Sequence, residues 1–236
     1  MGIIGAHVVQ VPAPSLFSLL RLDSVPIDPS LSDCVTTGDL RKPQHSELHE
    51  SMVSLAVAVE FLSVPTPLGD FSDEFVAAIL EMLFPEEYTK SLGDPCPLLR
   101  FGGKVWQWNP RCVIGGMLAV ANVRKPTSEY GEEIACCLSL AQEAREQGAG
   151  QMLTPAVVSL RKTKLVVVIA DMREERVLER VGANALALLQ RNSYGYGEAW
   201  GGFNVYVARW DITKAAERLG FTQFVAALGT YFLSAG

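Results

Sequence analysis

The sequence predicts an α+β fold that is rich in helix and contains a small sheet, and two patterns lead to this expectation. Residues 165–170 (LVVVIA) form an unbroken and mostly β-branched apolar run, which is typical of a strand buried on both faces. Helical apolar patterns occur on both sides of this run, at 46–62, 75–83 and 221–233. The alternative is an α/β fold built on a strand–helix–strand unit at 164–210.

The segment 164–210 is the part of the chain around which the rest is expected to pack. Asp171 directly follows the apolar run and Glu174 stands three residues later, which is the capping-box spacing of a helix start. Apolar residues then recur on one helical face up to residue 190. Residues 203–210 alternate between two sets of side chains, as a second strand does.

The remaining chain predicts further elements in order. A short strand is expected at 7–11, and helices at 46–62, at 75–83 with Ser72 or Asp70 as the cap, and at 86–92. A strand is expected at 104–108 after a turn at 101–103. Residues 112–123 are apolar and contain Gly115-Gly116, and their pattern fits a strand or a buried helix equally well. A helix capped by Thr127 or Ser128 ends before Gly148. Asp211 caps a helix that Gly220 ends, and 221–233 forms a last, apolar helix.

Two segments are predicted from the distribution of proline. Prolines at 12, 14, 26, 29 and 43 fix φ and remove hydrogen-bond donors, so residues 1–45 are expected to form an extended arm. The arm lies either on its own domain or on a neighbouring copy. Residues 46–236 contain no repeat or clean linker and are expected to form a single globular domain.

Composition limits the compartment and the cofactors. The five cysteines are an odd count without paired spacing, and neighbouring helical residues such as Cys136 and Cys137 point about 100° apart. With only three histidines, the chain predicts reduced thiols, no metal, no cofactor and a cytoplasmic location. The segment 52–64 is interrupted by Glu60 and too short to cross a bilayer, so no membrane span is expected.

A candidate ligand site joins the end of the central strand to a Gly and aromatic loop. Open α/β sheets bind ligands beyond the carboxyl ends of their strands, where Asp171 stands. Tyr194, Tyr196 and Trp200 lie among glycines and have rings that stack on a base or a sugar. The structural alternative makes Asp171 a helix cap and the loop a connection packed on the sheet.

Basic residues gather in the second half of the chain. Residues 1–100 carry 5 basic and 14 acidic side chains, whereas residues 161–218 carry 10 basic and 7 acidic ones. Placed on one surface, these cations neutralise phosphates, and the alternative is a solvated helix face with interleaved glutamates. The candidate nucleic-acid contacts are Arg161, Lys162, Lys164, Arg173, Arg176, Arg180 and Arg191.

These observations predict a non-enzymatic, self-associating assembly protein, such as a coat, nucleocapsid-like or scaffold subunit, with RNA as a second partner. No motif of a catalytic triad, zinc protease or phosphate loop is present, so no catalytic residue is assigned. The acidic first part of one copy is expected to meet the basic region of another, with Leu16, Phe17, Leu20 and the apolar tail as anchors. The alternative is a small α/β enzyme or ligand-binding domain that uses the Asp171 site.

Overall fold

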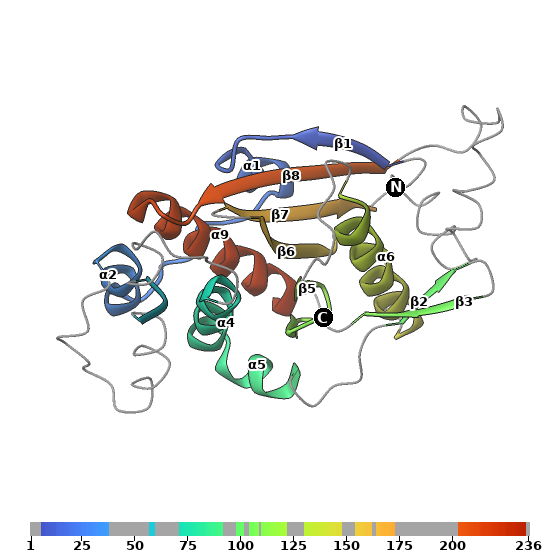
Figure 1. Cartoon of the computed structure of the whole chain (residues 1–236), viewed down its shortest axis with the longest axis horizontal. Helices are drawn as coiled ribbons and strands as arrows, with labels where there is room; N and C mark the ends of the chain where they lie inside the picture. The colour runs from blue at the N-terminus through green and yellow to red at the C-terminus, as the bar shows by residue number, and fades with distance from the viewer. Residues whose placement is uncertain are drawn as a thin grey trace.

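The computed structural model describes residues 6–37, 57–59, 71–91, 98–101, 104–108, 110–121, 130–147, 154–161, 164–172 and 203–234. Within these ranges the chain forms a six-stranded mixed sheet, a separate two-stranded sheet and helices on both faces of the larger sheet (Figure 1). This is the helix-rich α+β fold that the sequence predicts.

The described elements have the following bounds. The strands are β1 (Ala6–Gln10), β2 (Leu98–Phe101), β3 (Lys104–Gln107), β4 (Cys112–Ile114), β5 (Leu118–Val120), β6 (Ala156–Arg161), β7 (Lys164–Asp171) and β8 (Phe203–Asp211). The helices are α1 (Ser15–Leu20), α2 (Pro29–Thr37), α4 (Phe71–Leu83), α5 (Pro85–Ser91), α6 (Gly131–Glu146) and α9 (Ala215–Ser234).

The large sheet has the strand order β1-β8-β7-β6-β5-β4. Its centre is an antiparallel meander of β6, β7 and β8, to which β1 is added in parallel to β8 and β5 in parallel to β6. The neighbours β7 and β8 are antiparallel, whereas a strand–helix–strand crossover joins parallel strands. The helix predicted up to residue 190 lies outside the described residues.

The apolar run is the buried centre of the sheet, as predicted. None of the side chains from Leu165 to Ala170 is more than 1% exposed. A charged group introduced there has no route to water, which explains why the sequence keeps every one of these positions apolar. The backbone carbonyl of Val168 also accepts a weak hydrogen bond from the Cys137 thiol of α6, at 3.5 Å.

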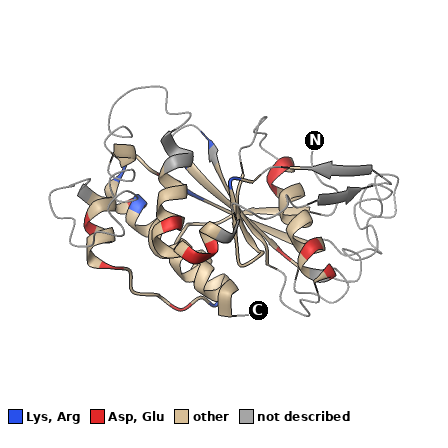
Figure 2. Cartoon of the chain, turned by 90° about the horizontal axis from the view of Figure 1, so that it is seen from below, with Lys and Arg blue, Asp and Glu red and all other residues tan. Residues whose placement is uncertain are grey.

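Two adjacent residues of β8 show which helices cover which face. Successive strand residues point to opposite faces. The Trp210 ring packs against Phe221 and Phe224 of α9, at centroid distances of 5.6 and 5.3 Å. Arg209 instead reaches Tyr130, the residue before α6. Helix α9 therefore lies on one face and α6 on the other, as the view in Figure 2 illustrates.

Residues 6–37 differ from the extended arm expected for 1–45, because they form β1, α1 and α2. Pro14 is the N-cap of α1 and Pro29 is the first residue of α2. Proline is tolerated at helix starts because its missing N–H has no partner there in any case. The prolines therefore begin helices here rather than keep the chain extended. Residues 38–45 lie outside the described range.

The apolar tail forms the end of one long helix, α9, which is packed within the subunit. The predicted helix over 221–233 is confirmed, and Phe221, Phe224 and Leu228 are fully buried. The predicted helix end at Gly220 is wrong. A Cβ at Gly220 would lie 3.6 Å from Trp210 Nε1. Gly220 therefore lies inside a continuous helix, at the place where the Trp210 indole packs against it.

The other described elements settle the ambiguous apolar stretch. Residues 112–120 form a hairpin of β4 and β5, turned by Gly115 and Gly116 at φ of +55° and +66°. These are left-handed conformations, which glycine adopts without strain. The predictions for α4, α5 and β3 are confirmed, and so is the helix α6, but it begins at Gly131 after the non-helical Tyr130, so the predicted cap at Thr127 or Ser128 is wrong. Of the helix predicted at 46–62, only residues 57–59 are described, and they are helical.

Candidate functional site

Strand β1 forms one edge of the large sheet, and the feature that distinguishes it is exposure. Among described strands it pairs only with β8, and its other side lies at the rim of the molecule (Figure 1). Val8 is 38% exposed and Val9 is 40% exposed. These two residues account for half of the four large exposed hydrophobic side chains in the described part of the chain.

The backbone of β1 presents hydrogen-bonding groups in an alternating pattern. The N–H of Val11 donates to the Val207 carbonyl of β8, at 3.0 Å. Because alternate strand residues direct their N–H and C=O groups to the same side, those of His7 and Val9 also point toward β8. The N–H and C=O groups of Ala6, Val8 and Gln10 point away from the sheet. The next residue in this outward series is Pro12, which has no N–H.

The β1 edge lacks the features that usually prevent strand addition. Proteins protect free edges with charged side chains, proline, bulges or a covering element. The segment Ala6–Gln10 contains no Lys, Arg, Asp, Glu or Pro. The opposite edge, β4, is only three residues long and is packed against α5 and α9. Within the described ranges the two edges of the large sheet are therefore different: α5 and α9 pack against β4, whereas no described strand pairs with the outer side of β1.

A polar cluster anchors the end of β1 from behind. Gln10 donates from Nε2 to the Tyr130 hydroxyl at 3.0 Å, and Arg209 of β8 donates from Nη2 to the same oxygen. The Tyr130 ring is buried, and the Arg161 guanidinium stacks over it at 4.2 Å from the centroid. Tyr130 has φ of +54°, a strained value for a non-glycine residue, which these contacts hold in place.

Glu133, in the first turn of α6, forms the ionic part of the same cluster. Its Oε1 accepts hydrogen bonds from Ser159 Oγ at 3.0 Å and from Arg161 Nε and Nη2 at 3.1 and 2.5 Å. Glu133 is 0% exposed, and its Oε2 has no hydrogen-bond partner. A buried carboxylate is tolerated only when it is paired, so Glu133 and Arg161 fix the position of α6 on β6.

Two of the predicted nucleic-acid contacts lie in the described part of the chain. Arg161 is engaged by Glu133 and Tyr130, with only 16% of its side chain exposed. Lys164 is exposed at the start of β7. Lys162 and the arginines 173, 176, 180 and 191 lie outside the described residues.

Two further cations of the region 161–218 are also engaged within the subunit. Arg218 is buried and donates to the carbonyls of Val35 and Ile212, each at 2.8 Å. Lys214 pairs with Glu217 at 2.7 Å. In Figure 2 the blue residues are correspondingly few and scattered. Arg161 and Lys164, however, lie opposite each other in the β6–β7 pairing, and Arg209 contacts the same Tyr130 as Arg161, so these three cations share one face of the sheet.

The alternative ligand site is described only at Asp171. This residue is the last of β7, is half-buried and lies opposite Asn204 of β8. Its position at the carboxyl end of the central strand agrees with the sequence. Tyr194, Tyr196 and Trp200, and the helix that Asp171 is predicted to cap, lie outside the described residues.

The apolar anchors expected for association pack inside the subunit instead. Leu16 and Leu20 of α1 are 0% and 4% exposed. Phe17 meets Phe224 of α9 edge-to-face at 5.5 Å. The expectation that these residues are presented to a neighbour is therefore wrong, because α9 offers a closer apolar surface.

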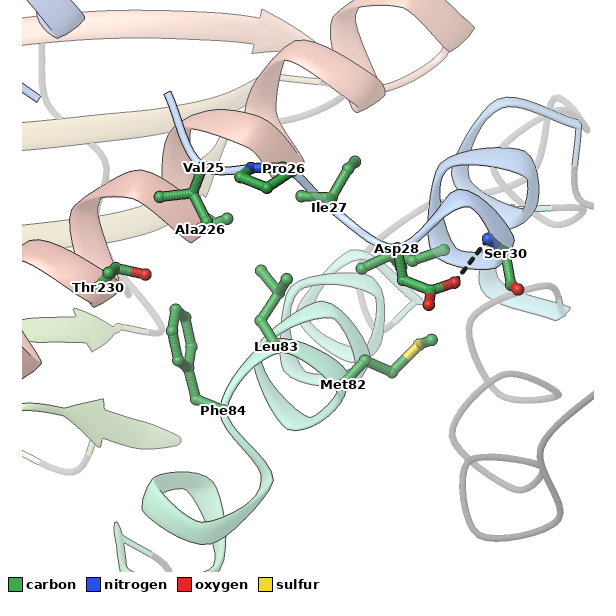
Figure 3. Close-up of a pocket in the computed structure, with 11 residues that line it drawn as sticks. Val25, Pro26, Ile27, Asp28, Ser30, Met82, Leu83, Phe84, Ala226 and Thr230 are labelled. Carbon is green, nitrogen blue, oxygen red and sulfur yellow. Dashed lines mark hydrogen bonds between the residues drawn. The ribbon is translucent and has the colours of Figure 1, made fainter. Parts of the chain in front are cut away.

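A cavity of about 260 Å³ lies between the 25–31 segment, the end of α4 and α9, and Figure 3 shows residues that line it. Its walls are mainly apolar, with Pro26, Leu83 and Phe84 facing one another. Asp28 is the acidic residue on its wall, and its Oδ1 accepts the Ser30 N–H at 2.7 Å as the cap of α2. Asp28 and Ser30 therefore serve the start of helix α2, and Thr230 of α9 is the other polar residue on the wall.

The described residues also bear on the cysteines, on metal binding and on membrane insertion. The four described cysteines are all buried, and none of them forms a disulfide. Within the described ranges no group of His, Cys, Asp and Glu is arranged to hold a metal ion. None of the described helices is long and apolar enough to cross a bilayer.

The chain matches no protein family model, no curated protein and no solved structure.

The sequence indicates the strand β1, but it does not indicate the polar cluster around Tyr130 that contacts this strand. An uncharged strand pattern near residue 8, ended by Pro12, is visible in the sequence. Its place at a sheet edge depends on pairing with β8, about 200 residues away. The Gln10–Tyr130 contact spans 120 residues, and nothing local marks either residue as a partner.

Proposed function

We propose that this chain is a self-associating structural subunit and that copies meet through the edge strand β1. The observation that carries the proposal is the open edge itself. Ala6–Gln10 is uncharged, exposes Val8 and Val9, and directs the N–H and C=O groups of three residues away from the sheet. Strand addition to such an edge is a general mode of protein recognition.

The energetics support weak rather than permanent association. Backbone hydrogen bonds contribute about 0.5–1.5 kcal/mol each, so six of them give roughly 3–9 kcal/mol. Association costs roughly 4–15 kcal/mol in translational and rotational freedom. At the favourable end of both ranges, a pair of five-residue strands with modest burial of Val8 and Val9 exceeds this cost by roughly 5–7 kcal/mol. The expected complex has a Kd on the order of tens to hundreds of micromolar and dissociates on dilution.

Charge has a steering role in the proposal. The acidic residues of 1–100 and the basic excess of 161–218 attract each other between copies. Arg161, Arg209, Lys214 and Arg218 already have partners within the subunit, so we assign this role to the exposed Lys164. Such attraction is screened within about 8–10 Å at physiological salt, so association is expected to weaken as salt is raised.

The proposal is tested by blocking the edge without disturbing the fold. Because the Val8 N–H points away from β8, Val8→Pro removes an outward donor and leaves the pairing with β8 intact. The matched control is Leu233→Lys, which removes a side chain that is equally exposed, at 40%, on α9. Sedimentation equilibrium between 5 and 500 µM compares the three proteins, and circular dichroism checks that each is folded.

We expect the wild type and Leu233→Lys to associate with increasing concentration and Val8→Pro to remain monomeric. A wild-type chain that is monomeric throughout the range would refute the proposal. Association of Val8→Pro to the wild-type extent would show that another surface is used. The same experiment is repeated with single-stranded RNA, the second predicted partner. If RNA binds the chain and the chain remains monomeric, a nucleic-acid-binding role is favoured over self-association.

A further inference from the structure

We propose that two copies pair through β1 in antiparallel orientation, about a twofold axis at Val8. The two six-stranded sheets then join into one continuous sheet of twice that size. This inference rests on the proposed function and specifies its partner, a second copy, and its register. A closed two-copy complex uses the same surface on both subunits, and a strand that pairs with itself about a twofold axis runs antiparallel.

The alternation of backbone groups restricts the possible registers. In an antiparallel pair, two opposite residues either exchange both hydrogen bonds or exchange none. Outward-pointing residues of one copy must therefore face outward-pointing residues of the other. Since Ala6, Val8 and Gln10 point outward and His7 and Val9 point toward β8, the axis passes through a residue and not between two residues.

Among these registers, the one centred on Val8 uses the whole strand. It places Val8 opposite Val8 of the second copy, and Ala6 opposite Gln10, so all three outward residues of each copy are paired. An axis at Val9 would place Ala6 opposite Pro12, which has no N–H to donate. An axis at His7 would place Gln10 opposite a residue before β1 begins.

The side chains of the Val8-centred register are compatible with each other. The two Val8 side chains meet on the face covered by α6, and His7 lies opposite Val9 on the other face. Cross-strand contacts between β-branched side chains stabilise a sheet, and no like charges are opposed. Gln10, held by the Tyr130 hydroxyl at 3.0 Å, fixes the far end of the strand in both copies.

Cysteine cross-linking tests this register directly. The four described cysteines are buried, and Cys96 is replaced by serine so that it does not contribute. His7→Cys, Val8→Cys and Val9→Cys are then introduced one at a time, and the full-length chains are oxidised gently at 200 µM. Opposite residues that exchange hydrogen bonds have Cα atoms about 5.5 Å apart, within the 4.4–6.8 Å range of disulfides.

We expect Val8→Cys to form a covalent dimer at least tenfold faster than His7→Cys or Val9→Cys alone. In the proposed register, the Cα atoms of His7 in the two copies are roughly 8 Å apart, beyond disulfide reach, and so are those of Val9. A mixture of His7→Cys and Val9→Cys chains is expected to give the mixed dimer, because these positions face each other.

The outcomes separate the register from the proposed function. Fastest cross-linking of Val9→Cys or His7→Cys alone would move the axis to that residue and overturn the register, while self-association through β1 would stand. Equal cross-linking at all three positions would indicate random collision and overturn the register as well. Sedimentation of the reduced variants is measured in parallel, and monomers at 200 µM in every case, wild type included, would overturn both proposals.

Discussion

Glu133 and Arg161 form a buried pair with unequal exposure. Glu133 is 0% exposed, whereas 16% of the Arg161 side chain reaches solvent. Removing one member of a buried pair leaves the other charge without compensation, and the cost depends on how well water reaches the remaining group. The loss of Arg161 should therefore be more harmful than the loss of the charge on Glu133.

We expect Arg161→Met to lower the free energy of unfolding by about 3–5 kcal/mol and Glu133→Gln by about 1–3 kcal/mol. The double variant should recover part of the loss, because neither charge is then buried alone. Glu86→Gln on α5, at an exposed acidic residue, is the control and should change stability by less than about 0.5 kcal/mol. Urea denaturation measures all four; equal losses for the two single variants would contradict this account.

The thiols give a second test at the scale of single residues. Burial raises the pKa of the Cys34 thiol to about 11 and that of Cys112 to about 12. Burial also raises the pKa of Cys136 and Cys137. Because the thiolate is the reactive form, very little of each is reactive at pH 8.

In a Cys96→Ser chain, we therefore expect a thiol-specific reagent at pH 8 to label no cysteine of the native protein within minutes. All four remaining cysteines should react once the chain is unfolded in guanidinium chloride. Rapid labelling of the native protein would show that at least one of these thiols is more accessible than the structure indicates.

Helix α9 carries two glycines with different surroundings, and they make a matched pair. A Cβ at Gly220 would lie at ordinary contact distance from Trp210, whereas a Cβ at Gly229 would lie 2.5 Å from Cε2 of Phe84. Glycine inside a helix costs about 0.5–1 kcal/mol relative to alanine. Only the first position can recover this energy, because at the second the Phe84 ring would have to move toward the cavity of Figure 3.

Gly220→Ala is expected to raise the free energy of unfolding by about 0.5–1 kcal/mol, and Gly229→Ala to lower it by about 1–3 kcal/mol. Phe84→Leu in the Gly229→Ala background should restore part of the loss by shortening the obstructing side chain. Thermal denaturation measures the changes. A Gly229→Ala protein as stable as Gly220→Ala would mean that the two helix surfaces are packed alike.

Elements defined by local patterns were predictable from the sequence, whereas contacts between distant elements were not. The run Leu165–Ala170 marks a buried strand because each of its residues is apolar, whatever its neighbours are. Gly220 was expected to end a helix, but the presence of Trp210 beside it is a tertiary fact that overrides the preference of glycine for helix ends. Pro14 and Pro29 were interpreted as signs of an extended arm. Proline also occurs at helix starts, so these residues alone do not distinguish the two structures.

For the candidate surface too, local patterns could be predicted from the sequence and long-range contacts could not. The uncharged strand Ala6–Gln10 could be predicted from its residues, but not its place at the sheet edge, which depends on β8. The pair of Arg161 with Glu133 could not be predicted, because a basic residue in the sequence does not reveal whether a carboxylate lies beside it. For the same reason, Arg161 was grouped with phosphate-binding cations, although it is engaged in the interior.

At the scale of the whole molecule, the described part of the large sheet ends at one covered edge and at one edge without a described neighbour. Strand β4 ends the sheet under the cover of α5, whereas β1 ends it at the rim (Figure 1). Through the large sheet, a subunit can therefore pair once, because β1 is the one edge strand of that sheet that no described helix covers. The β1 contact therefore accounts for a dimer, and a larger assembly would need a second surface in addition.

The claim that copies associate through β1 is tested most directly by NMR measurement of hydrogen exchange. The exchange rates of individual β1 amides are compared at protein concentrations of 20 and 500 µM. The amides of Val8 and Gln10 point outward and should exchange several-fold more slowly at the higher concentration, because a second copy then accepts their hydrogen bonds. The amide of Val9, already bonded to β8, is the internal control and should be equally protected at both concentrations. Equal exchange rates for Val8 and Gln10 at the two concentrations would contradict self-association through β1.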